Sequence, residues 1–543
     1  MHFVTASVLE AEAPRVAMRL VVEGPPVGAL WRRALLRAAV APLVVLAPLV
    51  AMAPTADHRF NIYWHGGLFR DDPLRIVPHT LDSLPSYLRM GNFRPLGRML
   101  EKLLDLFAYV LGDVLGIPAN IGFRLVSFAA AALLGVVAML LAESVVARGR
   151  MFRRPPSTLA AVVPFAVAGG LVAAGRASPV VLFAGLYLTS AALVLAVPAM
   201  LCRIHPQRPI RLWWILPLIV AGAALASFNE VAYLALPLAT VAVLARGRWV
   251  LALTGRRFWF AAPMRVLGLL WLGFLPVFLA VRMVINHYCS IQACYSGSDV
   301  SAGPEVFAAL PSRALGWFPP LMWQSATAGG SHQPWFSGVV LVVAAVTLLV
   351  LAVLALRDLG RLSAVDRPAG AVLLAVAAVA VLLGATMGAL NSEIQRAAAA
   401  GNWGFGWRDS AVTMPAGALL LAALGHLIRP GRRALIAGLV LLFAAMATVS
   451  ATANKRFRDE VMDTPAARLD DRLAQAMADF DPTPAGQDRR CALRAEFFTL
   501  FADVPFSQYR FDQSFDVAAQ QEAGVPFCPH GPTSATKPAS GGN

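Results

Sequence analysis

The residue with the clearest chemical potential is a carboxylate just beyond the first long apolar stretch of the chain. This residue, Asp57, falls where a membrane helix would end and a polar loop would begin. A carboxylate within hydrogen-bond reach of a hydroxyl can act as a general base toward it. Asp71 and Asp72 form a rival acid pair on the same loop, although acids before Pro73 more often make a solvated turn. Asp57 is therefore the first candidate for catalysis, with Asp71 and Asp72 as alternatives.

Three arginines are candidates for binding a phosphate. Arg94 and Arg98 stand four residues apart at the start of a predicted helix, so one phosphate could face both guanidiniums. An equal alternative is that both side chains only anchor the helix to lipid. Arg408 lies in the stretch 402–409, whose tryptophans suit a belt at the membrane interface.

Two further residues are candidates for binding an acceptor or a divalent metal. Glu230 lies in a tight connection between two apolar stretches, where its alternative role is to stabilise the start of the next helix. His58 directly follows Asp57, but the spacing of His58, His65 and His79 matches no metal-site pattern and favours surface histidines. A divalent metal thus stays open, and no other cofactor is indicated.

Several common chemistries lack their motifs. A P-loop needs a lysine after glycine, and none of the three lysines, Lys102, Lys455 and Lys537, follows one. The chain has no H-E-x-x-H, no C-x-x-C and no G-x-S-x-G sequence. These absences argue against an ATP-driven motor, a zinc protease, a thiol oxidoreductase and a hydrolase with a nucleophile elbow.

The elements that must position the candidate residues are membrane helices. Of the 543 residues, 58% are hydrophobic and 14% are charged, whereas soluble domains carry about 25% charged residues. Apolar stretches of about 20 residues predict spanning helices, so the fold class is an all-α polytopic membrane protein. About eleven spans are expected, at 34–54, 120–146, 158–174, 180–201, 212–227, 231–245, 262–283, 338–356, 369–388, 411–428 and 434–452. The third and fourth, and the fifth and sixth, are close enough to form helical hairpins.

The net charge of +15 reports the orientation of these spans. Arginines cluster beside the ends of alternate spans, and assigning those ends to one side gives a net charge of +17 there and −2 elsewhere. Basic residues concentrate on the cytoplasmic side of membrane proteins. The N-terminus is therefore expected inside and the C-terminus outside. The basic excess marks topology, and no nucleic-acid partner is implied.

This topology divides the chain into four parts. We expect a cytoplasmic tail at 1–33, a membrane domain at 34–452, an extracytoplasmic C-terminal domain at 453–528 and a disordered tail at 529–543. The first outer loop, 55–119, contains a predicted helix at 94–115 with one apolar and one polar face, which should lie in the membrane interface. Most polar sequence is outside, so the work of the protein is expected there.

The cysteines agree with this assignment of sides. Cys289 and Cys294 fall in one outer loop, and Cys491 and Cys528 fall in the C-terminal domain, where disulfides can form. We predict the pairs Cys289–Cys294 and Cys491–Cys528. The fifth cysteine, Cys202, lies at the inner end of a span and stays unpaired.

The layout resembles the GT-C class of polytopic glycosyltransferases, which use polyprenyl-phosphate-linked sugars. The resemblance is architectural over roughly 34–452, and its local motif is Asp57-His58-Arg59-Phe60, which is similar to the acidic motif on the first outer loop of those enzymes. Many of them carry a second acid where His58 stands here.

The resemblance implies a transferase in the plasma (inner) membrane, with its active side extracytoplasmic and with lipid bilayer, a lipid-linked sugar and a glycan or lipid acceptor as partners. Asp57 would act as the base on an acceptor hydroxyl, and Arg94, Arg98 and Arg408 would stabilise the departing lipid phosphate. The alternative is a non-catalytic transporter or flippase of a lipid-linked glycan.

Overall fold

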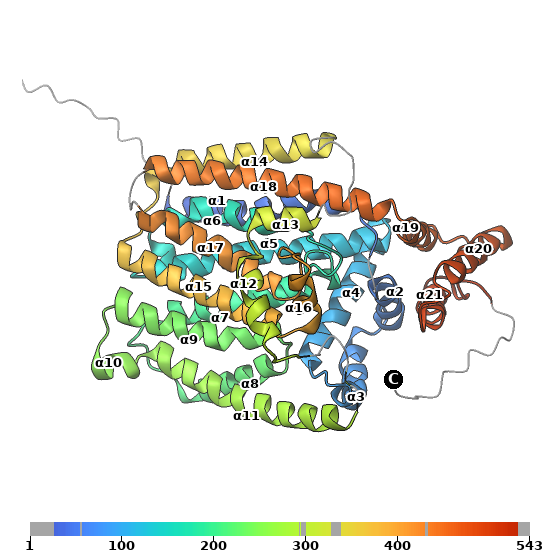
Figure 1. Ribbon diagram of the computed structural model, residues 1–543, viewed down its shortest axis with the longest axis horizontal. Coiled ribbons are helices and arrows are strands. Elements are labelled where there is room, and N and C mark those ends of the chain that lie inside the picture. Colours follow the sequence, from blue (N-terminus) through green and yellow to red (C-terminus); the bar gives the residue numbers. More distant parts are fainter. Residues whose placement is uncertain are drawn as a thin grey trace, which may run out of the picture.

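The computed structural model describes residues 26–54, 57–292, 294, 300–326, 338–428 and 433–529. These residues form a bundle of long helices with a group of shorter helices at one end (Figure 1). The first helices are α1 (Val27–Leu46), α2 (His58–Phe69), α3 (Ile76–Arg89), α4 (Pro95–Leu115), α5 (Ala119–Val146), α6 (Leu159–Gly170) and α7 (Leu186–Arg203). There follow α8 (Ile215–Ala226), α9 (Ala235–Ala245), α10 (Gly255–Trp259), α11 (Ala262–Ile291), α12 (Glu305–Leu315), α13 (Pro319–Ala326) and α14 (Val339–Asp358). The last are α15 (Arg367–Ala389), α16 (Ser392–Ala399), α17 (Ser410–Ile428), α18 (Arg433–Met462), α19 (Pro465–Ala478), α20 (Pro484–Leu500) and α21 (Ser507–Ala523).

Each of the eleven apolar stretches contains a helix, and the all-α membrane fold is confirmed. Within the described residues, eight helices are long and apolar enough to cross a membrane, namely α5, α7, α9, α11, α14, α15, α17 and α18, some with a short flanking turn. The apolar helices α6 and α8 are shorter, and α1 carries three arginines, Arg32, Arg33 and Arg37. Parts of the predicted tails, 1–25 and 530–543, lie outside the described residues.

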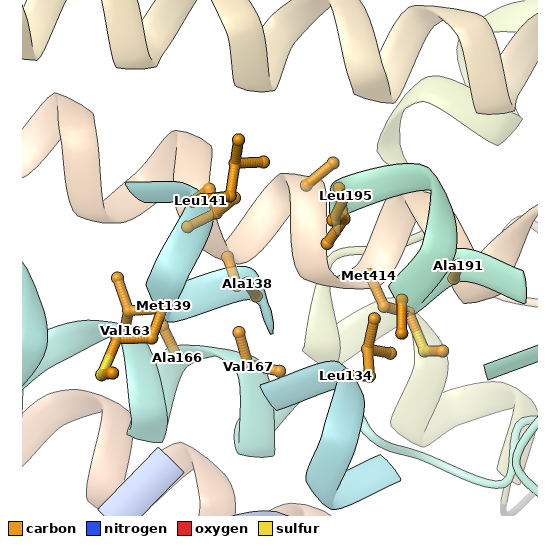
Figure 2. Close-up of a cluster of buried hydrophobic side chains, with 14 of the residues drawn as sticks. Leu134, Ala138, Met139, Leu141, Val163, Ala166, Val167, Ala191, Leu195 and Met414 are labelled. Carbon is orange, nitrogen blue, oxygen red and sulfur yellow. The ribbon is translucent and has the colours of Figure 1, made fainter. Parts of the chain in front are cut away.

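Small side chains let the long helices pack closely. Figure 2 shows Leu134 and Ala138 of α5, Val163 and Val167 of α6 and Met414 of α17 as members of one buried apolar cluster. A Cβ added to Gly222 of α8 would lie 2.0 Å from the carbonyl oxygen of Leu270 in α11. Glycine therefore sets how close these two backbones come, as is common between membrane helices.

The two expected hairpins do not form as packed pairs. The short helix α6 packs mainly on α1, α17 and α18 rather than on its sequence neighbour α7. Likewise, α8 packs mainly on α11, whereas α9 packs on α7. Glycine permits the close contact of α8 with α11, where Gly222 lies against Leu270 and Gly273 against Ile219.

Helix α4 has the expected extent, but its polar face is turned inward. Its residues Glu101, Lys102 and Asp105 are buried, whereas Phe107 and Val114 are exposed. The exposed apolar face suits a helix at a membrane interface. The polar face packs against α2 and α3 and carries charge into the interior of the helical group.

The C-terminal helices α19, α20 and α21 form a small unit docked on α2 (Figure 1). Phe497, Phe511 and Phe515 share one apolar cluster with Phe60 and Tyr63 of α2. A Cβ added to Gly67 would lie 2.7 Å from the Cα atom of Ala518, so α2 and α21 are in close backbone contact.

Both predicted disulfides are confirmed. The Cα atoms of Cys491 and Cys528 are 5.0 Å apart, and this bond links α20 to the segment after α21. The Cα atoms of Cys289 and Cys294 are 5.4 Å apart, and this disulfide lies against Gly91 in the turn before α4. Cys202 is buried and unpaired.

Candidate functional site

A cavity of about 490 Å³ opens where α2, α3, α4 and α21 meet. Three of the predicted site residues, Asp57, Arg94 and Arg98, line it. Its wall also contains residues that the sequence did not mark as site candidates, including Asn61, Trp64, His65, Tyr87, Glu101, Lys102, Phe183 and Arg510. The cavity lies at the end of the bundle where α1 ends and α5 begins (Figure 1).

Asp57 immediately precedes α2 and is held by the C-terminal unit. Arg510 of α21 donates a hydrogen bond from Nη1 to Oδ1 of Asp57, at 2.5 Å. The same guanidinium donates from Nη2 to Oδ1 of Asn61, at 3.3 Å. The Asp57 side chain is 61% exposed. It is thus fixed in direction while remaining open to the cavity.

A buried ion pair forms the floor beside Asp57. Arg98 donates from Nη1 to Oε2 of Glu101 at 2.9 Å, and Asn61 donates to Oε1 at 3.5 Å. Burial alone would raise the pKa of Glu101, but the guanidiniums of Arg98 and Arg94 outweigh it and hold the pKa below its usual value. Glu101 is therefore an anion that orients Arg98 rather than a proton donor.

Arg94 immediately precedes α4, and its side chain faces Glu230. Its Nη1 atom lies 3.8 Å from Oε2 of Glu230, and the Arg94 side chain is only 4% exposed. Burial opposes ionisation of Glu230, yet Arg94, Arg408 and Arg282 together hold its pKa below the usual value. The carboxylate of Glu230 thus interacts with the positive charges of three arginines. Glu230 stands directly before the following helical turn, although its side chain makes no capping hydrogen bond to it.

Arg408 stands behind this wall and does not line the cavity. Its Cζ atom lies 5.7 Å from the ring centre of Tyr187 and 5.1 Å from that of Trp407. The neighbouring Asp409 is buried and accepts hydrogen bonds from Arg313 at 2.6 and 2.9 Å. The charge of Arg408 contributes to the lowered pKa of Glu230, which links it to the site.

Lys102 and Asp105 of α4 form a second set of charges, in contact with α3 and α2. Lys102 donates from Nζ to Oγ1 of Thr80 at 2.8 Å, and burial lowers the pKa of Lys102 to about 8. His65 Nδ1 and Asp105 Oδ2 are 2.7 Å apart. Burial raises the pKa of Asp105 to about 6, although His65 opposes the rise. The sequence predicted one polar and one apolar face for α4, but it did not predict that the polar face points inward.

A strained turn forms the remaining wall. Phe183, Ala184 and Gly185 have φ values of 56°, 44° and 81°, a left-handed conformation that is costly for residues other than glycine. Arg124, which is fully buried, donates to the carbonyl oxygens of Met52, Ala53 and Val181 at 3.0, 2.8 and 2.7 Å. This one guanidinium ties the segment before Asp57 to the segment before the turn.

His58 supports the same turn and does not face the cavity. Its Nε2 atom accepts a hydrogen bond from the Phe183 backbone N–H at 3.3 Å, and its ring lies between Phe123 and Phe183. Burial lowers the pKa of His58 to about 4, so the ring is neutral. The structure places it as a support beneath Asp57.

Asp71 and Asp72 lie away from the cavity. Asp72 accepts a hydrogen bond from the Leu74 backbone N–H at 3.2 Å, as a turn residue does. Asp71 accepts from the side chain of Gln521 at 3.3 Å. Both acids are exposed, which agrees with the alternative that they form a solvated turn.

The carboxylates of the site do not fit a metal. Within the described part of the chain, no group of three His, Cys, Asp or Glu residues is close enough to hold an ion. Asp57, Glu101 and Glu230 each face a guanidinium instead. We therefore derive no step through a metal.

Comparisons with known proteins give one similarity. No family model and no curated protein matches the chain. Among solved structures, the chain is similar to the crystal structure of ArnT from Cupriavidus metallidurans bound to undecaprenyl phosphate, with 18% sequence identity and a TM-score of 0.34. The match covers 82% of this chain and 80% of that chain. We therefore base the function on the side chains of this protein.

Proposed function

We propose that this protein is a membrane glycosyltransferase that transfers a sugar from a polyprenyl-phosphate-linked donor to a cell-envelope acceptor on the outer face of the membrane. The observation that supports it best is one cavity, at the end of a membrane bundle, lined by an open carboxylate and two arginines. That set supplies a base for a hydroxyl and cations for a departing phosphate.

The proposed step is a substitution at the anomeric carbon of the sugar. The acceptor oxygen forms a bond to that carbon while the bond from the carbon to the phosphate oxygen breaks. Asp57 takes the proton of the acceptor hydroxyl, and the electron pair of the broken bond leaves with the lipid phosphate. The products are the glycosylated acceptor and the polyprenyl phosphate, so atoms and charge balance without a further reactant.

Asp57 is suited to this role by the way Arg510 holds it. The hydrogen bond reaches only Oδ1, and among the described residues no hydrogen bond reaches Oδ2. The free oxygen can accept a proton while the bonded one fixes the direction of the carboxylate. Orientation of this kind accelerates a reaction because the reacting groups need no further alignment.

Arg94 and Arg98 are suited to the leaving phosphate because both side chains line the cavity beside Asp57. Glu101 and Glu230 keep the two guanidiniums in place. The ring of Tyr87, whose centre lies 4.5 Å from Arg98 Cζ, and the indole of Trp64 offer flat surfaces for a sugar ring.

The test is a transfer assay with the purified full chain in proteoliposomes and a labelled polyprenyl-phosphate sugar as donor. Asp57→Asn is expected to lower the transfer rate by about 10²–10⁴-fold, the usual contribution of a general base. Asp72→Asn is the matched control, since Asp72 lies outside the cavity, and it should change the rate less than about twofold.

The same assay decides the alternative function. If Asp57→Asn transfers as fast as the unchanged protein, the assignment of the base is wrong. If the purified protein moves the labelled donor across the bilayer without transferring its sugar, the protein is a flippase.

A further inference from the structure

The opposite end of the bundle contains a second cavity that the proposed function does not use. Its volume is about 1,690 Å³, more than three times that of the first. Four segments form its wall: the end of α5 with the turn after it, the end of α7 with the loop after it, the segment from the end of α9 through α10, and the start of α11. Figure 1 shows α10 at this end and α2, α3 and α4 at the other.

The charge of this wall has one sign. Eight arginines line the cavity, and no aspartate or glutamate does: Arg148, Arg150, Arg153, Arg203, Arg208, Arg246, Arg257 and Arg265. Of these eight, only Arg148 makes an ion pair among the described residues, with Asp366. Like charges gathered in a concave wall repel one another and create a strong positive potential, which an anion relieves.

The wall is held in shape by hydrogen bonds between its segments. Arg246, only 7% exposed, donates to the carbonyl oxygens of Ser144 and Ala147 at 2.9 and 2.7 Å. The Ala262 backbone N–H donates to the carbonyl of Pro206 at 2.8 Å. Arg265 donates to the Arg208 carbonyl at 3.3 Å. Three loops that are far apart in sequence are therefore fixed relative to one another, as a binding site requires.

Positive charge at this end has a simpler explanation, which is orientation of the spans. Orientation requires only that basic residues lie near the helix ends, and it does not require them to surround a cavity free of acids. Arg211 and Arg256 belong to the same basic loops but do not line the cavity. Replacing arginines that line the cavity, and separately Arg211 and Arg256, therefore distinguishes anion binding from orientation of the spans.

We propose that this cavity binds an anion that carries more than one phosphate group. Guanidinium forks match phosphate oxygens in geometry and charge, and the volume exceeds what one phosphate fills. Phe152 and Phe260 line the same cavity and are exposed. The Phe152 ring centre lies 5.0 Å from Arg203 Cζ, which places an apolar edge beside the charges. Two sources have this chemistry: a lipid head group with two phosphates, and a soluble polyphosphate.

The test compares two double variants of the full chain, purified in detergent, with cardiolipin and inorganic triphosphate as probes in separate titrations. Arg208→Gln with Arg257→Gln removes two cavity charges, and Arg211→Gln with Arg256→Gln removes two charges beside it. We expect saturable binding of at least one probe by the unchanged protein. The first double variant should weaken it by about tenfold or more and the second by less than about twofold.

Each outcome has a defined meaning. Tight binding of cardiolipin alone identifies a lipid head group, and equal binding of triphosphate identifies a soluble polyphosphate. Equal weakening in both double variants, or no saturable binding of either probe, overturns the proposal and leaves orientation as the role of these arginines. Thermal unfolding of all variants checks that each one is folded.

Discussion

The two ends of the helical bundle treat charge in opposite ways. At the end with Asp57, carboxylates and guanidiniums alternate, and Asp57, Glu101 and Glu230 each face an arginine. At the other end, eight arginines line one cavity without any acid. Paired charges fix the direction of side chains at a desolvation cost, whereas charges of one sign that mostly lack a carboxylate partner attract a counter-ion. The first arrangement is suited to chemistry and the second to binding.

The largest effect is expected from replacing Arg124, because its hydrogen bonds hold together the end of the bundle that contains Asp57. Arg124→Met would leave the carbonyl oxygens of Met52, Ala53 and Val181 buried without their donor. A loss of roughly 3 kcal/mol or more is expected, since each buried polar group without a partner costs about 1–3 kcal/mol. Thermal unfolding of the purified protein measures it.

The control for that loss comes from the other end. Arg208 is exposed, and Arg208→Gln should change the free energy of unfolding by less than about 0.5 kcal/mol. Equal losses in the two variants would mean that the hydrogen bonds of Arg124 to the backbone add no more stability than an exposed arginine does.

Arg510 tests whether pairing at the Asp57 end serves catalysis. Arg510→Ala frees Asp57 to rotate and should lower the transfer rate by about 10–100-fold, and Arg510→Lys should restore part of it by keeping the charge. Arg489→Ala is the control, because Arg489 pairs with Asp481 on the surface of the same unit. An unchanged rate in Arg510→Ala would show that the C-terminal unit only packs against the site.

Much of this arrangement could be predicted from the sequence. The eleven apolar stretches, both disulfides and the position of Asp57 beyond the first stretch follow from local patterns that short segments carry on their own. The interior direction of Glu101 and Lys102 does not, since an amphipathic helix alone would turn its polar face to water. That direction is set by α2 and α3, which supply polar partners such as Asn61 and Thr80.

Arg510 could not be predicted for a different reason. It stands 453 residues after Asp57 in the chain, and no local pattern links the two. Their contact depends on how α21 docks against α2, where Gly67 permits the close approach of the two backbones. Packing of this kind between distant segments also explains why α8 joins α11 rather than α9.

Lys102 lines the cavity beside Asp57, so its titration should make donor binding at this end depend on pH. Its pKa is lowered to about 8, chiefly by burial. Below that pH the ammonium is charged and attracts an anionic donor, and above it the amine is neutral. The KM for the donor should therefore rise a few-fold between about pH 7 and 9, as measured in the transfer assay.

The controls for this pH effect are two methionine variants. Lys102→Met should give a KM that is flat across this range, and Lys455→Met, whose lysine pairs with Asp459 elsewhere, should keep the rise. A rise that survives in Lys102→Met would assign the titration to another group.

The smallest effect is expected where the two ends are independent. Arg208→Gln with Arg257→Gln should alter the transfer rate by less than about twofold, because these arginines lie at the opposite end of the bundle from Asp57. A large loss of transfer would mean that the two cavities act in one functional cycle, and it would contradict the proposal that they are independent.

The central claim is that the cavity beside Asp57 receives the lipid-linked phosphate. The most direct measurement is a cryo-electron microscopy map of the full chain in nanodiscs with added polyprenyl phosphate. The account predicts phosphate density within hydrogen-bond distance of Arg94 or Arg98, on the side of the cavity that Asp57 faces. An empty cavity beside Asp57, with phosphate density only among the arginines of the opposite end, would contradict it.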